Sequence, residues 1–360
     1  MTLSTFPHAE FPLGPFTPYA GNPIMRPQGD TWESASVYNP AAIVKDDRVV
    51  LLYRAHAADI VSHVGLATSV DGIHFDRHPD PVLSPSEDYD EFGCEDPRIT
   101  EIDGTYYLTY SGWDRTSAQL CLATSTDLFT WIKHGPLFPE FNTFLPVGDG
   151  VPGPWSKAGG ILPVPIDGRY LMYFGEGSIW YAWSDDLIHW TPCSNDEPVM
   201  TPTPPGTFGS FLVEVGPPPI ITNSGLILLL HNAAVKNDDG SVYYSCGQLL
   251  FSPAEPSRIL AQMNTPWLEP QAYEDKHGLV SNVTFVEGLV FFHGVWLAYY
   301  GQSDSTLGVA VYTVGDTYWT PAPDQPSGRS VPRSPGDDDA VAAVALRGHE
   351  SDVGGGQRVG

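Results

Sequence analysis

The chain has 360 residues, 42% of them hydrophobic and 12% aromatic, so it can bury a large core. A balance of 43 acidic against 17 basic residues gives a formal net charge of −26. That charge argues against nucleic acid and anionic membranes as partners, because both require basic patches on the protein.

Residues 1–34 are rich in proline and are expected to lead into the first structural unit. No basic region followed by a long apolar stretch marks a secretory signal, and no apolar run is long enough to span a membrane. We therefore expect a cytoplasmic protein, and the sequence is compatible with a homo-oligomer. The four cysteines lie far apart without the spacing of a zinc site or a disulfide framework, so neither a metal nor a cofactor is expected.

From residue 35 to residue 320 the chain contains five copies of a unit made only of short strands. Each copy opens on a polar or charged residue, and the openings begin at Asn39, Glu95, Lys157, Glu214 and Ser281. A second apolar run follows each opening, at residues 49–53, 106–110, 170–173, 226–231 and 296–300. Strand-only repeats at intervals of about 60 residues are typical of propeller blades. The sequence therefore predicts an all-β, five-bladed β-propeller whose first strands line a central channel.

A third phrase recurs after the second run of the first three copies, at residues 65–75, 121–131 and 181–190. Each phrase combines a strand, a Ser/Asp turn and an aromatic residue. We interpret these Asp and aromatic residues as structural. From about Pro321 onward Pro, Gly, Asp and Ser dominate, so residues 321–360 are expected to form a disordered tail.

The polar openings converge on one axis, and their acids are the candidates for catalysis. Glu95 and Asp96 are adjacent, and strand alternation predicts that only one of them reaches the channel. The alternative is a turn in which both acids pair with Arg98. Glu176 lies between glycines after an apolar strand, where the alternative is a solvated loop acid. Glu214 precedes Gly-Pro-Pro-Pro, which delays its strand and leaves the acid at the channel mouth.

Cleavage of a glycoside with inversion requires two carboxyl groups about 6.5–9.5 Å apart on opposite faces of the sugar. Acids on different blades can meet that distance around one channel, whereas neighbours in the chain cannot. Arg54, Arg98 and Lys157 would share the site and hold the acids ionised or donate to sugar hydroxyls.

Several phrases in family order resemble glycoside hydrolase family 130, the β-mannoside phosphorylases and β-mannosidases. They begin at Asn39-Pro-Ala, Leu52-Tyr-Arg54-Ala, Ser62-His63-Val-Gly, Phe92-Gly-Cys-Glu-Asp-Pro-Arg, Gly216-Pro-Pro-Pro and Tyr299-Tyr-Gly-Gln-Ser-Asp304. The resemblance implies a five-bladed propeller with Asp96 as a general acid that passes its proton through a hydroxyl of the bound mannose. It also implies that Asn39, Arg54, Arg98, Lys157 and Asp304 hold the mannose at the cleavage subsite. Ser62, His63 and His231 are further candidate substrate-binding residues.

The nucleophile divides the family into two branches. Phosphorylase members resemble one another in a His-Arg pair after the second strand of blade three, and they carry basic residues that hold phosphate. In this chain the corresponding places carry Glu176 and Glu214, which would repel phosphate and suit activation of water. We expect both to be ionised at neutral pH.

The resulting hypothesis is an inverting glycoside hydrolase that releases mannose from β-mannosides, above all β-1,2-linked ones, with Asp96, Glu176 and Glu214 as catalytic residues. The alternative is a β-mannoside phosphorylase producing α-mannose 1-phosphate, to which His231 could contribute a phosphate contact. A second alternative is an inactive sugar-binding propeller, against which the three acids argue. A propeller enzyme for arabinosides or fructosides would need an acid where Asn39 stands.

Overall fold

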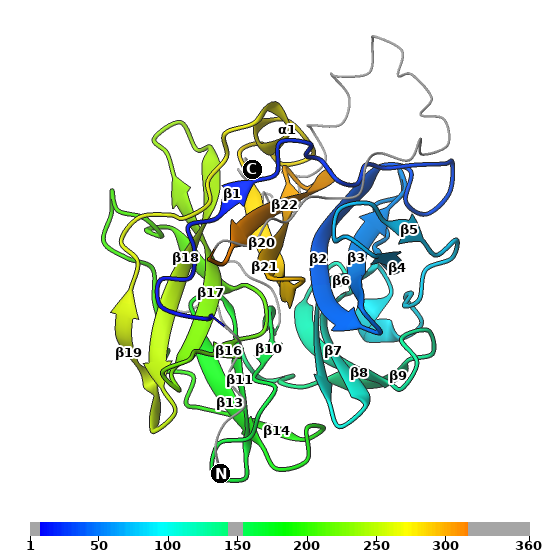
Figure 1. Ribbon diagram of the computed structural model, residues 1–360. Coiled ribbons are helices and arrows are strands. Elements are labelled where there is room, and N and C mark those ends of the chain that lie inside the picture. The colour runs from blue at the N-terminus through cyan, green and yellow to red at the C-terminus, as the bar shows by residue number, and fades with distance from the viewer. Residues whose placement is uncertain (1–7, 143–153, 316–360) are drawn as a thin grey trace, which may run out of the picture.

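The computed structural model describes residues 8–142 and 154–315. Five antiparallel sheets surround a common centre as the blades of a propeller, which confirms the predicted fold (Figure 1). The expected tail at residues 321–360 lies outside the described residues. No helix in the described part of the chain is long and apolar enough to cross a membrane.

The first two blades each have four strands in sequence order from the channel outward. Blade 1 consists of β2 (Ser36–Lys45), β3 (Arg48–His56), β4 (His63–Ser69) and β5 (Asp76–Arg77). The short helix η1 (Asp88–Asp90) leads into blade 2, which consists of β6 (Gly93–Ile102), β7 (Thr105–Trp113), β8 (Ala118–Ser125) and β9 (Ile132–Pro136).

Blades 3 and 4 are linked by a strand that leaves one and joins the other. Blade 3 consists of β10 (Gly160–Ile161), β11 (Tyr170–Phe174), β13 (Trp180–Ser184) and β14 (Trp190–Pro192). Blade 4 consists of β15 (Leu212–Val215), β17 (Ile227–Lys236), β18 (Val242–Ser252) and β19 (Glu255–Gln262), with β16 (Ile220–Ile221) also on β17. The two-residue strand β12 (Glu176–Gly177) follows blade 3 in the chain but pairs with β15 of blade 4.

Blade 5 is completed by the N-terminal segment. The short helix α1 (Tyr273–Lys276) precedes its strands β20 (Thr284–Phe292), β21 (Val295–Gln302) and β22 (Thr306–Thr313). The fourth strand is β1 (Thr17–Pro18), which pairs with β22 and lies beside it in Figure 1. The segment expected to lead into the propeller thus supplies the outer strand of its last blade.

The same segment also attaches to blade 1. Buried Glu33 accepts hydrogen bonds from the Tyr53 hydroxyl at 2.8 Å and from Arg77 at 3.0 Å. Because β1 belongs to blade 5, these contacts tie the last blade to the first and close the ring.

Apolar side chains fill the space between neighbouring blades. Each of the five interfaces has its own buried cluster, for example Val49, Leu51 and Tyr53 against Leu297 and Tyr299 between blades 1 and 5. The clusters hold the inner strands in place, so the polar groups that begin those strands have fixed positions around the channel.

The repeated Ser/Asp turns are structural, as predicted. In blade 1 the Asp71 carboxylate accepts hydrogen bonds from the Ser69 hydroxyl at 2.8 Å and from the backbone N–H of Ile73 at 2.9 Å. Asp127 and Asp186 make the equivalent contacts in blades 2 and 3.

Candidate active site

A polar cavity of about 170 Å³ lies where the inner strands meet. Seven of the eleven residues predicted for the site line it, namely Asn39, Arg54, Asp96, Lys157, Glu176, Glu214 and Asp304. The remainder of its wall consists of Tyr244, Val280, Val283 and Phe285. The cavity therefore joins a charged wall to an apolar one.

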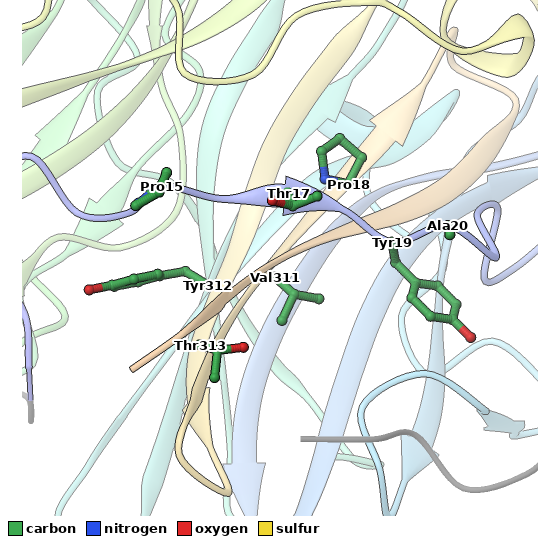
Figure 2. Close-up of a pocket in the computed structure, with 8 residues that line it drawn as sticks. All are labelled: Pro15, Thr17, Pro18, Tyr19, Ala20, Val311, Tyr312 and Thr313. Carbon is green, nitrogen blue, oxygen red and sulfur yellow. The ribbon is translucent and has the colours of Figure 1, made fainter. Parts of the chain in front are cut away.

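A larger hollow of about 510 Å³ lies on the outer side of blade 5 (Figure 2). Its walls come from β1 and β22, and it is lined by Pro15, Thr17, Pro18, Tyr19, Ala20, Val311, Tyr312 and Thr313. No carboxylate, imidazole, amine or guanidinium is among these eight residues, so the smaller cavity is the candidate for chemistry.

A β-bulge brings Asp96 into the cavity. The register of β6 with β7 shifts between Glu95 and Arg98, and Asp96 has a positive φ of 49°. This break in alternation turns Glu95 and Asp96 the same way, and both contact Arg54, at 2.6 and 2.9 Å. The cavity lining includes Asp96 and not Glu95, which agrees with the prediction that only one of the two acids reaches the channel, although a bulge and not regular strand alternation places it there.

A shift in strand register like that of β6 also occurs in two other inner strands. The register of β2 shifts between Tyr38 and Pro40, around Asn39 with a φ of 48°. The register of β20 shifts between Val286 and Gly288, around Glu287. Asn and Asp tolerate positive φ better than most residues, which suits both to these places.

Two cations hold the carboxylate of Asp96. Arg54 Nη1 lies 2.9 Å from one oxygen, and Lys157 Nζ lies 3.0 Å from the other. Burial favours the neutral acid, yet the charges of Lys157 and Arg54 outweigh it and hold the pKa of Asp96 well below its usual range. Asp96 is therefore ionised in the free protein, and a role as general acid requires that it gain a proton when substrate binds.

Ser62 acts on this site through Arg54. Its hydroxyl accepts a hydrogen bond from Arg54 Nε at 2.9 Å and donates to Glu95 at 3.2 Å. Arg54 is thus fixed from three sides, and Ser62 does not line the cavity.

Glu176 and Glu214 face each other across the β12–β15 pair. Trp155 Nε1 donates to Glu176 at 2.7 Å, whereas Oε1 of buried Glu214 accepts no hydrogen bond among the described residues. Burial, with the neighbouring Glu176 charge, raises the pKa of Glu214 well above its usual range. This direction runs against the expectation that Glu214 is ionised at neutral pH.

The backbone conformation on both sides of Glu176 requires glycine. Gly175 and Gly177 have φ values of 126° and 87°, and a Cβ on Gly175 would overlap the carbonyl oxygen of Ser178. The chain can therefore turn out of blade 3 and place Glu176 on blade 4.

Lys157 lies between Asp96 of blade 2 and Glu176 of β12 and contacts both. Its Nζ lies 3.0 Å from Asp96 Oδ2 and 3.8 Å from Glu176 Oε2. The Asp96 and Glu176 oxygens can therefore be no further apart than the sum of these two distances. That sum lies near the lower limit of the separation of about 6.5–9.5 Å between the two carboxyl groups of inverting glycosidases. Substrate binding has to displace Lys157 from Asp96 and Glu176 if a water molecule is to lie between the sugar and the base.

Arg98 lies beneath the cavity rather than in its wall. It is 1% exposed and donates to the carbonyl oxygens of Asp96, Val215 and Gly216 at 2.7–2.9 Å. It also contacts Glu287 at 3.0 Å. Arg98 therefore cannot reach a sugar directly, and it joins the strands that carry Asp96 and Glu214.

Glu287 was not predicted as a site residue. It is fully buried, and burial raises its pKa to about 8. The available signal was its position, since an acid followed by Gly288 stands in β20 where Asn39 and Asp96, each followed by Pro, stand in β2 and β6. Asp304, at the turn after β21, also has a raised pKa of about 6, again because of burial.

Neither predicted histidine lines the cavity. His231 is buried, its ring lies 5.9 Å from that of Phe208, and burial lowers its pKa to about 3. A neutral, enclosed imidazole cannot contribute a charge to phosphate binding. His63 contacts the Ser84 hydroxyl at 3.0 Å outside the cavity.

The family model for glycoside hydrolase family 130, described as β-1,4-mannooligosaccharide phosphorylase, matches residues 15–317. The chain belongs to glycoside hydrolase family 130. A 1,2-β-oligomannan phosphorylase from Thermoanaerobacter sp. (strain X514) is 36% identical over 306 residues, which are 82% of this chain and 96% of the relative.

Two solved structures resemble this chain over more than four-fifths of its length. A putative glycosidase from Bacteroides thetaiotaomicron is 36% identical with a TM-score of 0.75, over 82% of this chain and 96% of the other. A structure from work on family 130 glycoside hydrolases that target β-1,2 mannosidic linkages in Candida mannan is 34% identical with a TM-score of 0.74, over 87% and 97% of the two chains. Relatives of this family 130 chain thus include both phosphorylases and hydrolases.

Proposed function

We propose that this family 130 protein cleaves β-mannosides, with β-1,2-linked manno-oligosaccharides as the preferred substrates. The cavity of about 170 Å³ is smaller than the pockets of about 300–1,000 Å³ that enclose larger ligands, which suits a single sugar ring. Its charged wall can bind hydroxyl groups, and its apolar wall can cover the C–H face of the ring. The names of the relatives support the β-1,2 linkage.

The acid step is assigned to Asp96. A mannose that enters the cavity takes hydrogen bonds from Lys157 and Arg54 and weakens their hold on Asp96. Burial then dominates and raises the pKa of Asp96, so the carboxyl can carry a proton to the leaving oxygen. The same displacement of Lys157 makes room for a water beside Glu176.

The base step is assigned to Glu176. Because burial raises the pKa of Glu214 and Glu176 lines the same cavity opposite it, we assign the acceptance of a proton from water to Glu176. The water oxygen attacks the anomeric carbon, the glycosidic C–O bond breaks, and the leaving oxygen takes the proton from Asp96. Attack from the face opposite the leaving group gives α-mannose.

Phosphorolysis is the second candidate, and the comparison with the Thermoanaerobacter phosphorylase favours it. The charge of the cavity favours water instead. Among the described residues that line the cavity, Asp96, Glu176, Glu214 and Asp304 stand beside two cations, Arg54 and Lys157, and both cations already contact carboxylates. A phosphate dianion would have to enter beside these acids, which is the observation on which we prefer hydrolysis.

A linkage panel tests the substrate assignment. The protein is incubated with β-1,2-mannobiose and β-1,4-mannobiose, each with and without phosphate, and the products are separated by chromatography. We expect cleavage of the β-1,2 disaccharide. Preference for the β-1,4 disaccharide would contradict the linkage, and no cleavage under any condition would contradict the proposed function.

A further inference from the structure

Trp155 contacts the proposed base directly, although none of the cleavage steps above uses it. Its indole Nε1 donates a hydrogen bond to Glu176 Oε2 at 2.7 Å. An indole N–H is a donor and never an acceptor, so it can serve only to hold an oxygen of Glu176. Trp155 is not among the described residues that line the cavity. Any effect of Trp155 on the reaction therefore passes through the carboxylate that it holds.

The indole of Trp155 is fixed by blade 2. The backbone N–H of Trp155 donates to the carbonyl oxygen of Phe141 at 3.1 Å, and that of Ser156 donates to the carbonyl oxygen of Ala118, the first residue of β8, at 2.9 Å. The ring meets that of Trp113, the last residue of β7, edge to face at 5.9 Å between the centroids. Both the backbone and the ring are therefore attached to blade 2, which gives the indole N–H a fixed direction.

Glu176, in contrast, stands on a short and permissive piece of backbone. The strand β12 has two residues, and Gly175 and Gly177 on either side of Glu176 have positive φ. Glycine restricts the backbone less than any other residue. From the described part of the chain, Trp155 Nε1 at 2.7 Å and Lys157 Nζ at 3.8 Å both approach the same oxygen, Oε2. The direction of the carboxylate depends on these two contacts.

The two contacts differ in what a bound sugar does to them. Lys157 lines the cavity and also contacts Asp96 at 3.0 Å, and the proposed reaction requires that the sugar displace it from both acids. Trp155 lies behind Glu176, outside the cavity lining, so the sugar leaves its hydrogen bond in place. During the reaction Trp155 then keeps Oε2 occupied, and Oε1 is the oxygen that is left for the water.

We propose that Trp155 is a positioning residue, whose indole N–H holds Oε2 of Glu176 so that Oε1 faces the attacking water. This inference rests on the proposed function, in which Glu176 takes a proton from that water. A general base works only within hydrogen-bond reach of the group that it deprotonates, and a hydrogen bond to a charged group fixes geometry as well as contributing energy. Loss of the indole N–H therefore lowers kcat and leaves sugar binding intact.

Two substitutions separate the N–H of Trp155 from the bulk of its ring. Trp155→Phe keeps an apolar ring without a donor. Trp155→His keeps a five-membered ring whose Nε2–H can stand where the indole Nε1–H stands. The kcat and KM of both variants are measured on β-1,2-mannobiose, with and without phosphate. We expect W155F to lower kcat by about 10- to 100-fold with little change in KM, and W155H to recover most of that loss.

Trp131→Phe is the matched control. Trp131 Nε1 also donates a hydrogen bond, to the carbonyl oxygen of Leu128 at 3.1 Å, but it does so in the outer turn of blade 2. W131F should therefore keep the kcat of the wild type. A wild-type kcat in W155F would overturn the proposal. A kcat of W155H no higher than that of W155F would also overturn it, because the bulk of the ring and not its N–H would then matter.

A double-mutant cycle tests whether Trp155 acts through Glu176. Residues in one hydrogen-bonded pair have non-additive effects, so adding W155F to Glu176→Gln should lower kcat by much less than W155F lowers it in the wild type. Additive losses would overturn the proposal. A wild-type kcat in E176Q alone would contradict the assignment of the base, which is the failure of the proposed function.

A last readout needs no turnover. In ¹H–¹⁵N NMR spectra, the indole signal that W155F or W155H removes identifies Trp155 Nε1–H. We expect this signal to move upfield in E176Q, because a neutral amide replaces the charged acceptor. An unmoved signal would overturn the inference even if mannosides are cleaved. A moved signal without cleavage of any mannoside would confirm the hydrogen bond and contradict the proposed function alone.

Discussion

Glu176 and Glu214 are direct cross-strand partners, although one follows blade 3 and the other opens blade 4. Two carboxylates directly opposite each other in a sheet repel, and Glu214 is buried as well. Burial and the neighbouring Glu176 charge therefore raise the pKa of Glu214 well above its usual range. This difference in surroundings is the reason why we propose different roles for the two glutamates.

The first prediction concerns that difference. Glu176→Gln removes the proposed base and should lower kcat by about 10²–10⁴-fold. Glu214→Gln replaces a buried carboxyl group, whose pKa is raised, by a neutral amide of the same shape, so it should lower kcat by about tenfold or less. The measurement is kcat and KM of both variants on β-1,2-mannobiose at neutral pH. The reverse order of the two effects would show that Glu214 is the base.

The second prediction tests the acid. Asp96→Asn should reduce kcat by about 10²–10⁴-fold with nearly unchanged mannose affinity. Asparagine is the suitable replacement because residue 96 has a φ of 49°, which asparagine tolerates. Calorimetric binding of mannose checks that the cavity is intact, and turnover close to that of the wild type would remove Asp96 from the mechanism.

The five blades could be predicted because strand-only repeats and their Ser/Asp turns are local patterns. The orientation of Asp96 could not be obtained from strand alternation, since the bulge in β6 breaks it. Asn39-Pro40 and Asp96-Pro97 nevertheless signal that break, because proline cannot donate to the ladder.

The remainder of the site depends on contacts between blades. The pairing of Glu176 with Glu214 rests on a two-residue strand that crosses between sheets, which no local pattern indicates. Glu287 was missed because it lies in an apolar strand and its partner Arg98 comes from another blade. His231 was assigned to the site from its place in the chain, and burial keeps it neutral.

The third prediction concerns ring closure. Glu33→Ala leaves Arg77 and the Tyr53 hydroxyl without their buried partner, so it should lower the free energy of unfolding by about 3–5 kcal/mol. Glu274→Ala is the control, because its ion pair with Arg26 is largely exposed and should contribute about 0–1 kcal/mol. Equal effects in denaturant unfolding would show that Glu33 does not close the ring.

The fourth prediction concerns residues 321–360, whose composition cannot build a core. Truncation after residue 320 should leave kcat and Tm nearly unchanged. A Tm lowered by several degrees in calorimetry would indicate that these residues stabilise the propeller.

The central claim is that water, and not phosphate, accepts the mannosyl group. The most direct test incubates the protein with β-1,2-mannobiose in buffers with and without phosphate and follows the first product by NMR. We predict α-mannose as the initial anomer in both buffers, at equal rates. Formation of α-mannose 1-phosphate, or a rate that depends on phosphate, would contradict hydrolysis and establish the phosphorylase alternative.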